Sequence, residues 1–196
     1  MDSPEDNKKY WEQRYINGET GWDTGCISAP LKAYIDQLTN KNLRILIPGC
    51  GSAYEAQYLH DQGFSNVVVV DLVQLALDRL TERSPNFPMK HIVRGDFFTH
   101  EGQYDLILEQ TFLSSIDPRF RPAYVKKIHS LLTPNGKLSG VLFDFELDGG
   151  PPYGGSINEY ESNFKLLFDI HTLEPCYNSS ATWQDLELFI ILNRKT

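Results

Sequence analysis

The feature that most constrains the fold is an apolar run that leads directly into a glycine-rich turn, Leu43-Arg44-Ile45-Leu46-Ile47-Pro48-Gly49-Cys50-Gly51-Ser52. Apart from Arg44, the residues before Pro48 are apolar, as in a strand that is covered on both faces. Pro48 cannot donate a hydrogen bond to a sheet, so the strand should end there. Gly49 and Gly51 then permit backbone angles and close approaches that a side chain would forbid. The segment predicts a buried strand and a tight turn.

A helix and a second strand follow this turn, as in a nucleotide-binding βαβ unit. Residues 53–60 have helix-forming character, and Gly63 stands where a helix should stop. The next run, Asn66-Val67-Val68-Val69-Val70-Asp71, is rich in valine and ends in a carboxylate. Asp71 lies 20 residues after Gly51, the separation at which an acid reaches the hydroxyls of a ribose. A helix cap or a loop acid is the alternative interpretation of Asp71.

The turn departs from the dinucleotide pattern at one position. A dinucleotide site would carry a third glycine at position 54, where this chain has Tyr54. A bulky residue there disfavours a pyrophosphate at the helix N-terminus, and therefore a nicotinamide-dependent oxidoreductase. A ligand with a ribose and no phosphate fits better, and S-adenosylmethionine is the common one.

The composition indicates one globular domain that spans residues 1–196, with 41% hydrophobic and 22% charged residues. The net charge of −8 is spread along the chain without a basic run, so we expect no nucleic-acid partner. The acidic start and the lack of a membrane-length apolar run predict a cytoplasmic protein without a membrane partner. The three cysteines and five histidines lack metal-site spacing, so we expect no metal. Oligomeric state does not follow from the sequence, and we assume a monomer.

Aromatic residues gather in a leader that precedes the first strand. Trp11 and Tyr15 fall on one side of a short predicted helix, and Trp22 lies in a glycine-rich loop. In one interpretation these rings are ordinary core. In the other, residues 1–25 form a lid that folds over a ligand pocket, excludes water and supplies flat contact surfaces.

Two further segments follow predicted strands and should lie at the carboxyl edge of the sheet, where doubly wound folds bind ligands. Asp96 and Phe97 suit an adenine, with a carboxylate for the base edge and a ring for its face. A turn with core phenylalanines is the alternative. Glu109 and Gln110 end the next strand and are expected at the pocket floor. Glu109 is a candidate base, a candidate partner for a cofactor ammonium group, or a helix-capping acid.

The C-terminal third should complete the sheet. Residues 120–132 favour a helix, Pro134-Asn135-Gly136 a turn, and residues 137–143 a strand. Residues 168–173 and 186–192 are typical of two strands that form a terminal hairpin.

An irregular loop follows the strand predicted at 137–143. The segment Asp148-Gly149-Gly150-Pro151-Pro152-Tyr153-Gly154-Gly155 contains four glycines and two prolines, so it cannot continue a helix or a strand. It should overhang the pocket, and Tyr153 is its only large side chain. We therefore expect Tyr153 to line a substrate site.

With these pieces in place, the chain resembles the thiopurine methyltransferase superfamily, and most of all its thiol and halide methyltransferase branch. The resemblance spans nearly the whole chain. The motifs that carry it are Trp11-x-x-x-Tyr15, Gly18-x-Thr20-Gly21-Trp22-Asp23, Ile47-Pro48-Gly49-Cys50-Gly51, Gly95-Asp96-Phe97-Phe98, Tyr104-Asp105-Leu106-Ile107, Arg121-Pro122-Ala123-Tyr124 and Asp148-Gly149-Gly150-Pro151-Pro152-Tyr153. Two departures stand out: Tyr15 replaces a residue that is usually Trp, and residues 180–184 lack an expected arginine.

The resemblance implies an α/β class I methyltransferase fold, a Rossmann-like, doubly wound sheet with six parallel strands and one antiparallel strand. It also implies methyl transfer from S-adenosylmethionine to a small soft nucleophile, in the first place a thiol, with halide and thiopurine as further acceptors. By motif, the residues that would contact the cofactor are Trp11, Tyr15, Trp22, Gly49, Gly51, Asp71, Asp96, Phe97 and Gln110. Trp22 and Tyr153 would lie on the acceptor side.

Such a reaction needs little acid–base chemistry, because the sulfonium is already activated and positioning and desolvation dominate. No hydrolase motif or paired base stands out, so no catalytic residue is assigned. A small-metabolite O- or N-methyltransferase with Glu109 as its base, and a non-catalytic protein that binds an adenosyl ligand, are the alternatives.

Overall fold

The computed structural model describes residues 4–147 and 149–196. Its helices are α1 (Pro4–Ile16), α2 (Ala29–Ile35), α3 (Tyr54–Asp61), α4 (Gln74–Arg83), α5 (Arg121–Leu131) and α6 (Ile157–Phe164). Its strands are β1 (Ile45–Pro48), β2 (Val67–Asp71), β3 (Ile92–Arg94), β4 (Tyr104–Gln110), β5 (Leu132–Phe143), β6 (Phe168–Pro175) and β7 (Glu187–Arg194). Short 3-10 turns are η1 (Met89–His91), η2 (Phe97–Thr99), η3 (Phe112–Ser115) and η4 (Pro118–Phe120).

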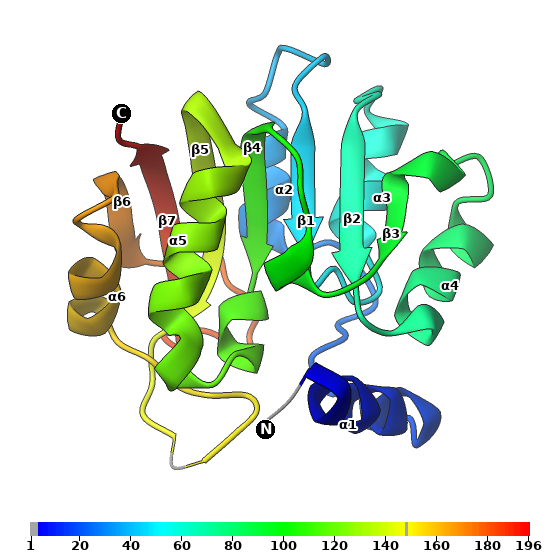
Figure 1. Cartoon of the computed structure of the whole chain (residues 1–196), viewed down its shortest axis with the longest axis horizontal. Coiled ribbons are helices and arrows are strands. Elements are labelled where there is room, and N and C mark those ends of the chain that lie inside the picture. Colours follow the sequence, from blue (N-terminus) through cyan, green and yellow to red (C-terminus); the bar gives the residue numbers. More distant parts are fainter. Residues whose placement is uncertain (1–3, 148) are drawn as a thin grey trace.

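The seven strands form one sheet in the order β3-β2-β1-β4-β5-β7-β6 (Figure 1). Every neighbouring pair is parallel except those that include β7, which runs antiparallel to both β5 and β6. This confirms the expected doubly wound sheet with one reversed strand and the terminal hairpin. The chain moves outward from β1 to β3 and then returns to β4 beside β1, so the switch point lies between β1 and β4.

Helices cover both faces of the sheet because its central strands are apolar on both sides. In β1, Ile45 and Ile47 pack in a core with residues of α2, α3 and α4, whereas Leu46 belongs to the core that α5 and α6 cover. Successive side chains of a strand point to opposite faces. The alternation along β1 therefore places α2, α3 and α4 on one face and α5 and α6 on the other.

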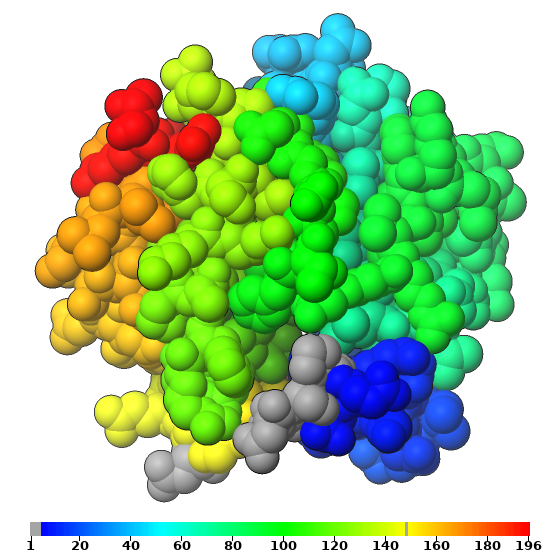
Figure 2. Space-filling view, viewed as in Figure 1, coloured from blue at the N-terminus to red at the C-terminus, as the bar shows by residue number. Residues whose placement is uncertain are grey.

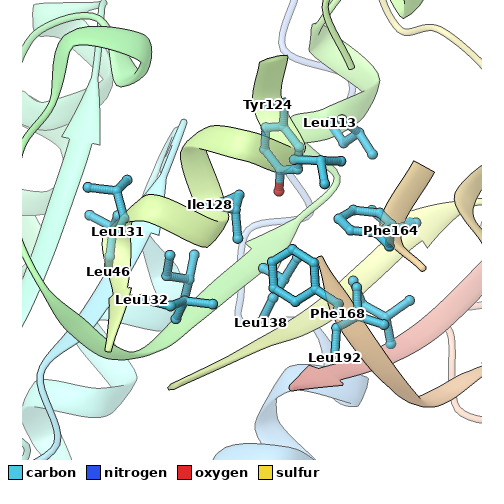
Figure 3. Packing of buried hydrophobic residues seen from close by; sticks show 14 of the residues in the cluster. Leu46, Leu113, Tyr124, Ile128, Leu131, Leu132, Leu138, Phe164, Phe168 and Leu192 are labelled. Carbon is cyan, nitrogen blue, oxygen red and sulfur yellow. The ribbon is translucent and has the colours of Figure 1, made fainter. Parts of the chain in front are cut away.

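The core under α5 and α6 is built from large side chains of both helices and of the strands beneath them, as Figure 3 shows. Tyr124 and Ile128 of α5 are completely buried there. Phe164 of α6 meets Phe168 of β6 edge to face, with ring centroids 5.7 Å apart. Truncation of a side chain such as Ile128 to alanine typically costs about 2–5 kcal/mol, so this core fixes where α5 stands on the sheet.

One expected boundary is wrong. The predicted turn Pro134-Asn135-Gly136 lies inside β5, which begins at Leu132. Tyr104 of β4 faces Leu132 and Leu106 faces Lys137, so two steps along β4 correspond to five along β5. The turn-forming residues are accommodated as a bulge in the strand, which is where proline and glycine are tolerated in a sheet.

The carboxyl ends of the parallel strands lie together at the lower edge of the sheet in Figure 1. Helix α1 and the long loop before α6 lie along this same edge, and the space-filling view in Figure 2 shows α1 against the rest of the molecule there. Residues 1–3 of the predicted lid and Asp148 of the predicted loop are outside the described residues. No helix in the described part of the chain has the length and apolar character needed to cross a membrane.

Candidate active site

The turn after β1 adopts the conformation for which its glycines are suited. Gly49 and Gly51 have φ values of +53° and +52°, in the left-handed region that other residues rarely adopt. The turn is held by the N–H of Cys50, which donates to the carbonyl of Val70 at 3.3 Å. A Cβ added at Gly51 would lie 3.3 Å from the hydroxyl of Tyr15. The glycines thus permit both the turn and the close approach of the leader.

Asp71 joins the ends of β1 and β2. Its Oδ2 accepts a hydrogen bond from the N–H of Gly51 at 2.9 Å, and its Oδ1 accepts one from the N–H of Val73 at 2.9 Å. Burial raises the pKa of this carboxyl, although the hydrogen bonds from Val73 and Gly51 act in the opposite direction. Each carboxylate oxygen has a further lone pair, so these bonds leave acceptor capacity for a ribose hydroxyl. The ribose role of Asp71 stays a prediction.

The segment after β3 has its acid and its ring in different environments. Oδ1 of Asp96 accepts a hydrogen bond from the N–H of Phe98 at 2.9 Å and so caps η2. Phe97 is only 3% exposed, and its ring packs against Phe98, Phe112 and Tyr124. The Phe97 ring is buried, whereas Phe98 is 37% exposed, and a role of Asp96 and Phe97 at adenine stays a prediction.

The leader packs on the edge of the sheet through a small aromatic cluster of its own. Tyr15 and the partly buried rings of Trp11 and Trp22 pack with residues at the start of α4, apart from the two main cores. The Trp22 ring meets those of Trp11 and Tyr15 edge to face, with centroids 5.3 and 5.8 Å apart. The rings therefore lie beside the glycine turn, and the role of residues 1–25 as a lid over a ligand pocket stays a prediction.

An ion pair with no local signal in the sequence connects the leader to α4 and to the glycine turn. Asp23 lies next to Trp22, and its Oδ2 accepts from Arg79 Nη1 of α4 at 2.8 Å and from the hydroxyl of Ser52. Burial acts to raise the pKa of Asp23, but the hydrogen bonds from Ser52 and the Gly25 N–H, with the charge of Arg79, outweigh it and lower the pKa. The only sequence signal was the place of Asp23 in the Trp-Asp motif, because its partner is 56 residues away.

Glu109 and Gln110, the last residues of β4, point to opposite sides of the sheet. Oε1 of Gln110 accepts a hydrogen bond from the Ser28 hydroxyl at 2.6 Å, on the side of α2. Glu109 is fully buried on the side of α5, where it accepts from the Tyr124 hydroxyl and, at 3.1 Å, from the N–H of Leu113. Burial raises the pKa of Glu109 to about 7. The expectation that Glu109 lies on the pocket floor is wrong, and its capping alternative applies.

The loop of residues 149–155 forms one wall of a cavity of about 490 Å³. The N–H of Tyr153 donates to the carbonyl of Ser114 in η3 at 2.7 Å, and the Tyr10 hydroxyl of α1 donates to the carbonyl of Pro151 at 3.4 Å. The leader and this loop therefore meet across the carboxyl edge of the sheet. The cavity is lined by Pro118, Arg121, Phe145, Glu146, Leu147, Gly149, Tyr153, Gly154, Gly155, Ser156 and Glu159.

A buried arginine at this cavity connects α5 to α6 and to the loop of residues 149–155. Arg121 is 1% exposed, and its Nη1 lies 2.7 and 2.8 Å from the two carboxylate oxygens of Glu159. Its Nη2 donates to the carbonyl of Gly154 at 2.6 Å, which holds the end of the loop. In the sequence, Arg121 stands out only as part of a motif, because its partner Glu159 is 38 residues away.

The residues brought together here fit an adenosyl ligand. At the end of β1, Gly49 and Gly51 let the Phe112 ring and the Tyr15 hydroxyl come close to the backbone. An acid with spare acceptor capacity stands at the end of β2, and the aromatic rings of the leader pack beside the turn. Among the described residues, no group of three His, Cys, Asp or Glu side chains is arranged to hold a metal ion.

This fold and this edge define a class I S-adenosylmethionine-dependent methyltransferase. A solved structure with the same fold is 1,6-didemethyltoxoflavin-N1-methyltransferase from Burkholderia thailandensis, with 1,6-didemethyltoxoflavin and S-adenosylhomocysteine bound. It superposes with a TM-score of 0.77 at 16% identity and covers 100% of this chain and 92% of that one. The solved structure shows the fold only, and the family is assigned from the sequence comparisons below.

The chain belongs to the thiopurine S-methyltransferase family, whose family model matches residues 6–187. Probable thiol methyltransferase 2 of Arabidopsis thaliana is 33% identical over 157 residues, which cover 77% of this chain and 69% of that protein. A thiopurine S-methyltransferase of Nitrosospira multiformis is 26% identical over 218 residues, with 96% and 99% covered. The resemblance that the motifs indicated is thereby confirmed.

Proposed function

We propose that the protein transfers the methyl group of S-adenosylmethionine to a small thiol. The observation that carries the proposal is that the carboxylates around the glycine turn already have partners. Asp71 accepts two backbone N–H groups, Asp23 is paired with Arg79, and Glu109 is held by Tyr124 and Leu113. A hydroxyl or amine acceptor needs a free base, whereas a thiol can react as a thiolate that brings its own charge. The names of the thiol and thiopurine methyltransferase relatives support the same acceptor class.

The chain's own part in this reaction is to bind and to exclude water. Bound S-adenosylmethionine supplies an activated methyl group. We assign Gly49 and Gly51 to its close approach, Asp71 to its ribose, and Trp11, Tyr15 and Trp22 to the lid that shields it from water. In-line positioning of a desolvated thiolate can then provide most of the rate enhancement.

We place the acceptor in the cavity beside the loop of residues 149–155. Its wall joins η3, which follows β4 at the switch point, through the hydrogen bond between Tyr153 and Ser114. Phe145, Leu147 and Tyr153 give it apolar walls, and Glu159 offsets the charge of Arg121 at its floor. The surplus carboxylate of Glu146 disfavours an acceptor with its own carboxylate. A small thiol without negative groups other than its sulfur fits this lining.

The decisive experiment is an acceptor screen at saturating S-adenosylmethionine, read by release of S-adenosylhomocysteine. Alkyl and aryl thiols, thiopurines, halides, small phenols and small amines are compared at equal concentration. We expect turnover with thiols. Turnover only with phenols or amines would favour an O- or N-methyltransferase, and cofactor binding without turnover on any acceptor would favour a non-catalytic binding protein.

A pair of tyrosine variants tests the location of the acceptor site. Tyr153→Ala should raise the KM for the thiol by about tenfold or more while the Kd of S-adenosylhomocysteine changes little, because the ring lines the cavity. Tyr177→Ala is the matched control, since Tyr177 is 92% exposed and does not line the cavity. Equal kinetics of the two variants would place the acceptor elsewhere.

A further inference from the structure

The ring of Phe112 lies directly on the glycine turn. A Cβ added at Gly49 would come within 2.6 Å of Cγ of Phe112, closer than real Cβ contacts allow. Gly49 is therefore required by its left-handed φ of +53° and also by the ring above it. Neither the local sequence nor the family motifs singled out Phe112.

The backbone holds this ring in one place. Thr111 has φ 56° and ψ 12°, a left-handed conformation that is costly for a β-branched residue and persists only where the surroundings enforce it. The N–H of Thr111 donates to the carbonyl of Val141 at 3.1 Å, and the N–H of Leu113 donates to Glu109 at 3.1 Å. The Ser115 hydroxyl donates to the carbonyl of Phe112 at 2.7 Å. These hydrogen bonds hold the residues before and after Phe112 to β5 and β4, and a third bond closes η3 around it.

The ring packs on one aromatic layer and remains partly exposed. Its centroid lies 5.4 Å from that of Phe97, edge to face, and 6.2 Å from that of Tyr124. Both of these partners are buried, whereas Phe112 is not. A core side chain would be enclosed on all sides. Phe112 instead packs on Phe97 and Tyr124 on one side and is partly exposed on the other, so it can line a binding site.

The order of the strands indicates which part of the ligand meets this wall. The inference rests on S-adenosylmethionine as the cofactor, with its ribose at Asp71 on β2. Strand β1 stands between β2 and β4, and Phe112 follows β4. The ribose carries the adenine on one side and, through its C5′, the positively charged sulfonium on the other. With the adenine on the side of β3, where Asp96 follows the strand, a ligand that extends from β2 across β1 places the sulfonium at Gly49.

We propose that the ring of Phe112 contacts the sulfonium of S-adenosylmethionine. Aromatic rings attract cations within about 6 Å of their centroid, and the attraction grows where water is excluded. The product S-adenosylhomocysteine has a neutral thioether at the same place and gains none of this attraction. Phe112 therefore favours the charged cofactor over the neutral product and assists product exchange.

The test compares the Kd of S-adenosylmethionine with that of S-adenosylhomocysteine by calorimetry. In Phe112→Leu, we expect S-adenosylmethionine to lose about 3- to 30-fold more affinity than S-adenosylhomocysteine, the range for a cation on an aromatic ring. Phe112→Tyr should keep the wild-type ratio. Phe112→Met retains most of the volume without the ring and should behave like Phe112→Leu. Phe120→Leu removes an exposed ring elsewhere and should leave both values unchanged.

The opposite outcomes are distinct. Equal loss of both ligands in Phe112→Leu and Phe112→Met would mean that the ring only shapes the pocket, and tighter binding of both would mean that it obstructs the site. Either result overturns the proposal. Failure of the wild-type protein to bind either ligand would instead overturn the cofactor on which the proposal rests. Thermal unfolding of each variant confirms that the protein measured is folded.

Discussion

The backbone N–H of Gly51 donates a hydrogen bond to Oδ2 of Asp71 at 2.9 Å, and this bond closes the edge of the sheet between β1 and β2. The two strands are parallel neighbours with Pro48 opposite Val70, so their carboxyl ends meet although 20 residues separate the bonded pair. The acid therefore has two tasks, because it holds the turn and also stands where a ribose would lie.

Substitution of Asp71 separates these tasks. Asp71→Ala should weaken S-adenosylmethionine binding by about 1–3 kcal/mol, the cost of losing a charged hydrogen-bond partner. Asp71→Asn keeps one oxygen that can accept a backbone N–H, so it should lower the free energy of unfolding less than Asp71→Ala does. Calorimetry and thermal unfolding measure the two effects. Unchanged affinity in a folded Asp71→Ala protein would exclude the ribose role.

The leader should respond to ligand as a lid does. Trp11, Tyr15 and Trp22 pack in a small cluster of their own, so residues up to 25 can open without disturbing the main cores. We expect limited proteolysis within residues 4–25 to be slower at saturating S-adenosylhomocysteine than without it. Equal cleavage rates in the two states would mean that the leader is ordinary packed structure.

The ion pair between Asp23 and Arg79 should set how often the lid opens. Arg79→Gln removes the charge that faces Asp23 and also the guanidinium that lies over the Tyr15 ring, 4.9 Å from its centroid, so it weakens two contacts of the leader with α4. This variant should be cleaved faster than the wild type in the absence of ligand. Arg44→Gln is the control, since Arg44 forms an ion pair with Asp105 away from the leader. If the two variants were cleaved alike, the Asp23 pair would not be holding the lid.

Features of the site with a local signal could be predicted, and those set by side-chain direction could not. The strand, the glycine turn and Asp71 were predictable because each depends on a few neighbouring residues and on parallel pairing. Glu109 and Gln110 show the limit. Both end the same strand, but consecutive side chains point to opposite faces, and only the packing of α5 decides which one becomes buried.

Contacts between distant segments were also out of reach. Asp23 meets Arg79 and Arg121 meets Glu159 only after the leader, α4 and α6 have docked on the sheet. The Phe112 ring depends on a left-handed threonine, and a β-branched residue gives no sequence signal for that conformation. The sequence alone therefore indicated the kind of ligand better than it indicated the walls of the site.

Glu109 should make stability depend on pH. Its carboxyl has an ordinary pKa of 4.5 when unfolded and a pKa of about 7 in the folded protein, because of burial. Between these values the folded protein binds more protons than the unfolded chain, so the free energy of unfolding falls as pH rises, by roughly 3 kcal/mol over the interval. Glu109→Gln removes this titration. Urea unfolding at pH 5 and pH 8 should therefore show a smaller loss in the variant, and equal losses would contradict the buried, titrating carboxyl.

The pH dependence of turnover should belong to the acceptor. A thiol reacts as its thiolate, and a free thiol titrates near ~8.5. The rate at sub-saturating thiol should climb with pH and level off near the pKa of that thiol. It should level off at lower pH when a more acidic aryl thiol replaces an alkyl thiol, whereas a halide acceptor would show no such dependence.

Glu109→Gln tests the same conclusion from the side of the protein. The substitution removes a carboxylate but leaves the charge of the nucleophile and the hydrogen-bonding capacity toward Leu113 and Tyr124, so kcat/KM for a thiol should change less than about threefold. The pH at which the rate levels off should be the same in the variant and the wild type, because the pKa of the thiol sets it and not the pKa of Glu109, which is about 7 in the wild type. Two results together would contradict this prediction: a rate that follows a pKa near 7 for every thiol, and loss of turnover in Glu109→Gln while S-adenosylmethionine still binds. They would identify Glu109 as a base and make a hydroxyl or amine the better acceptor.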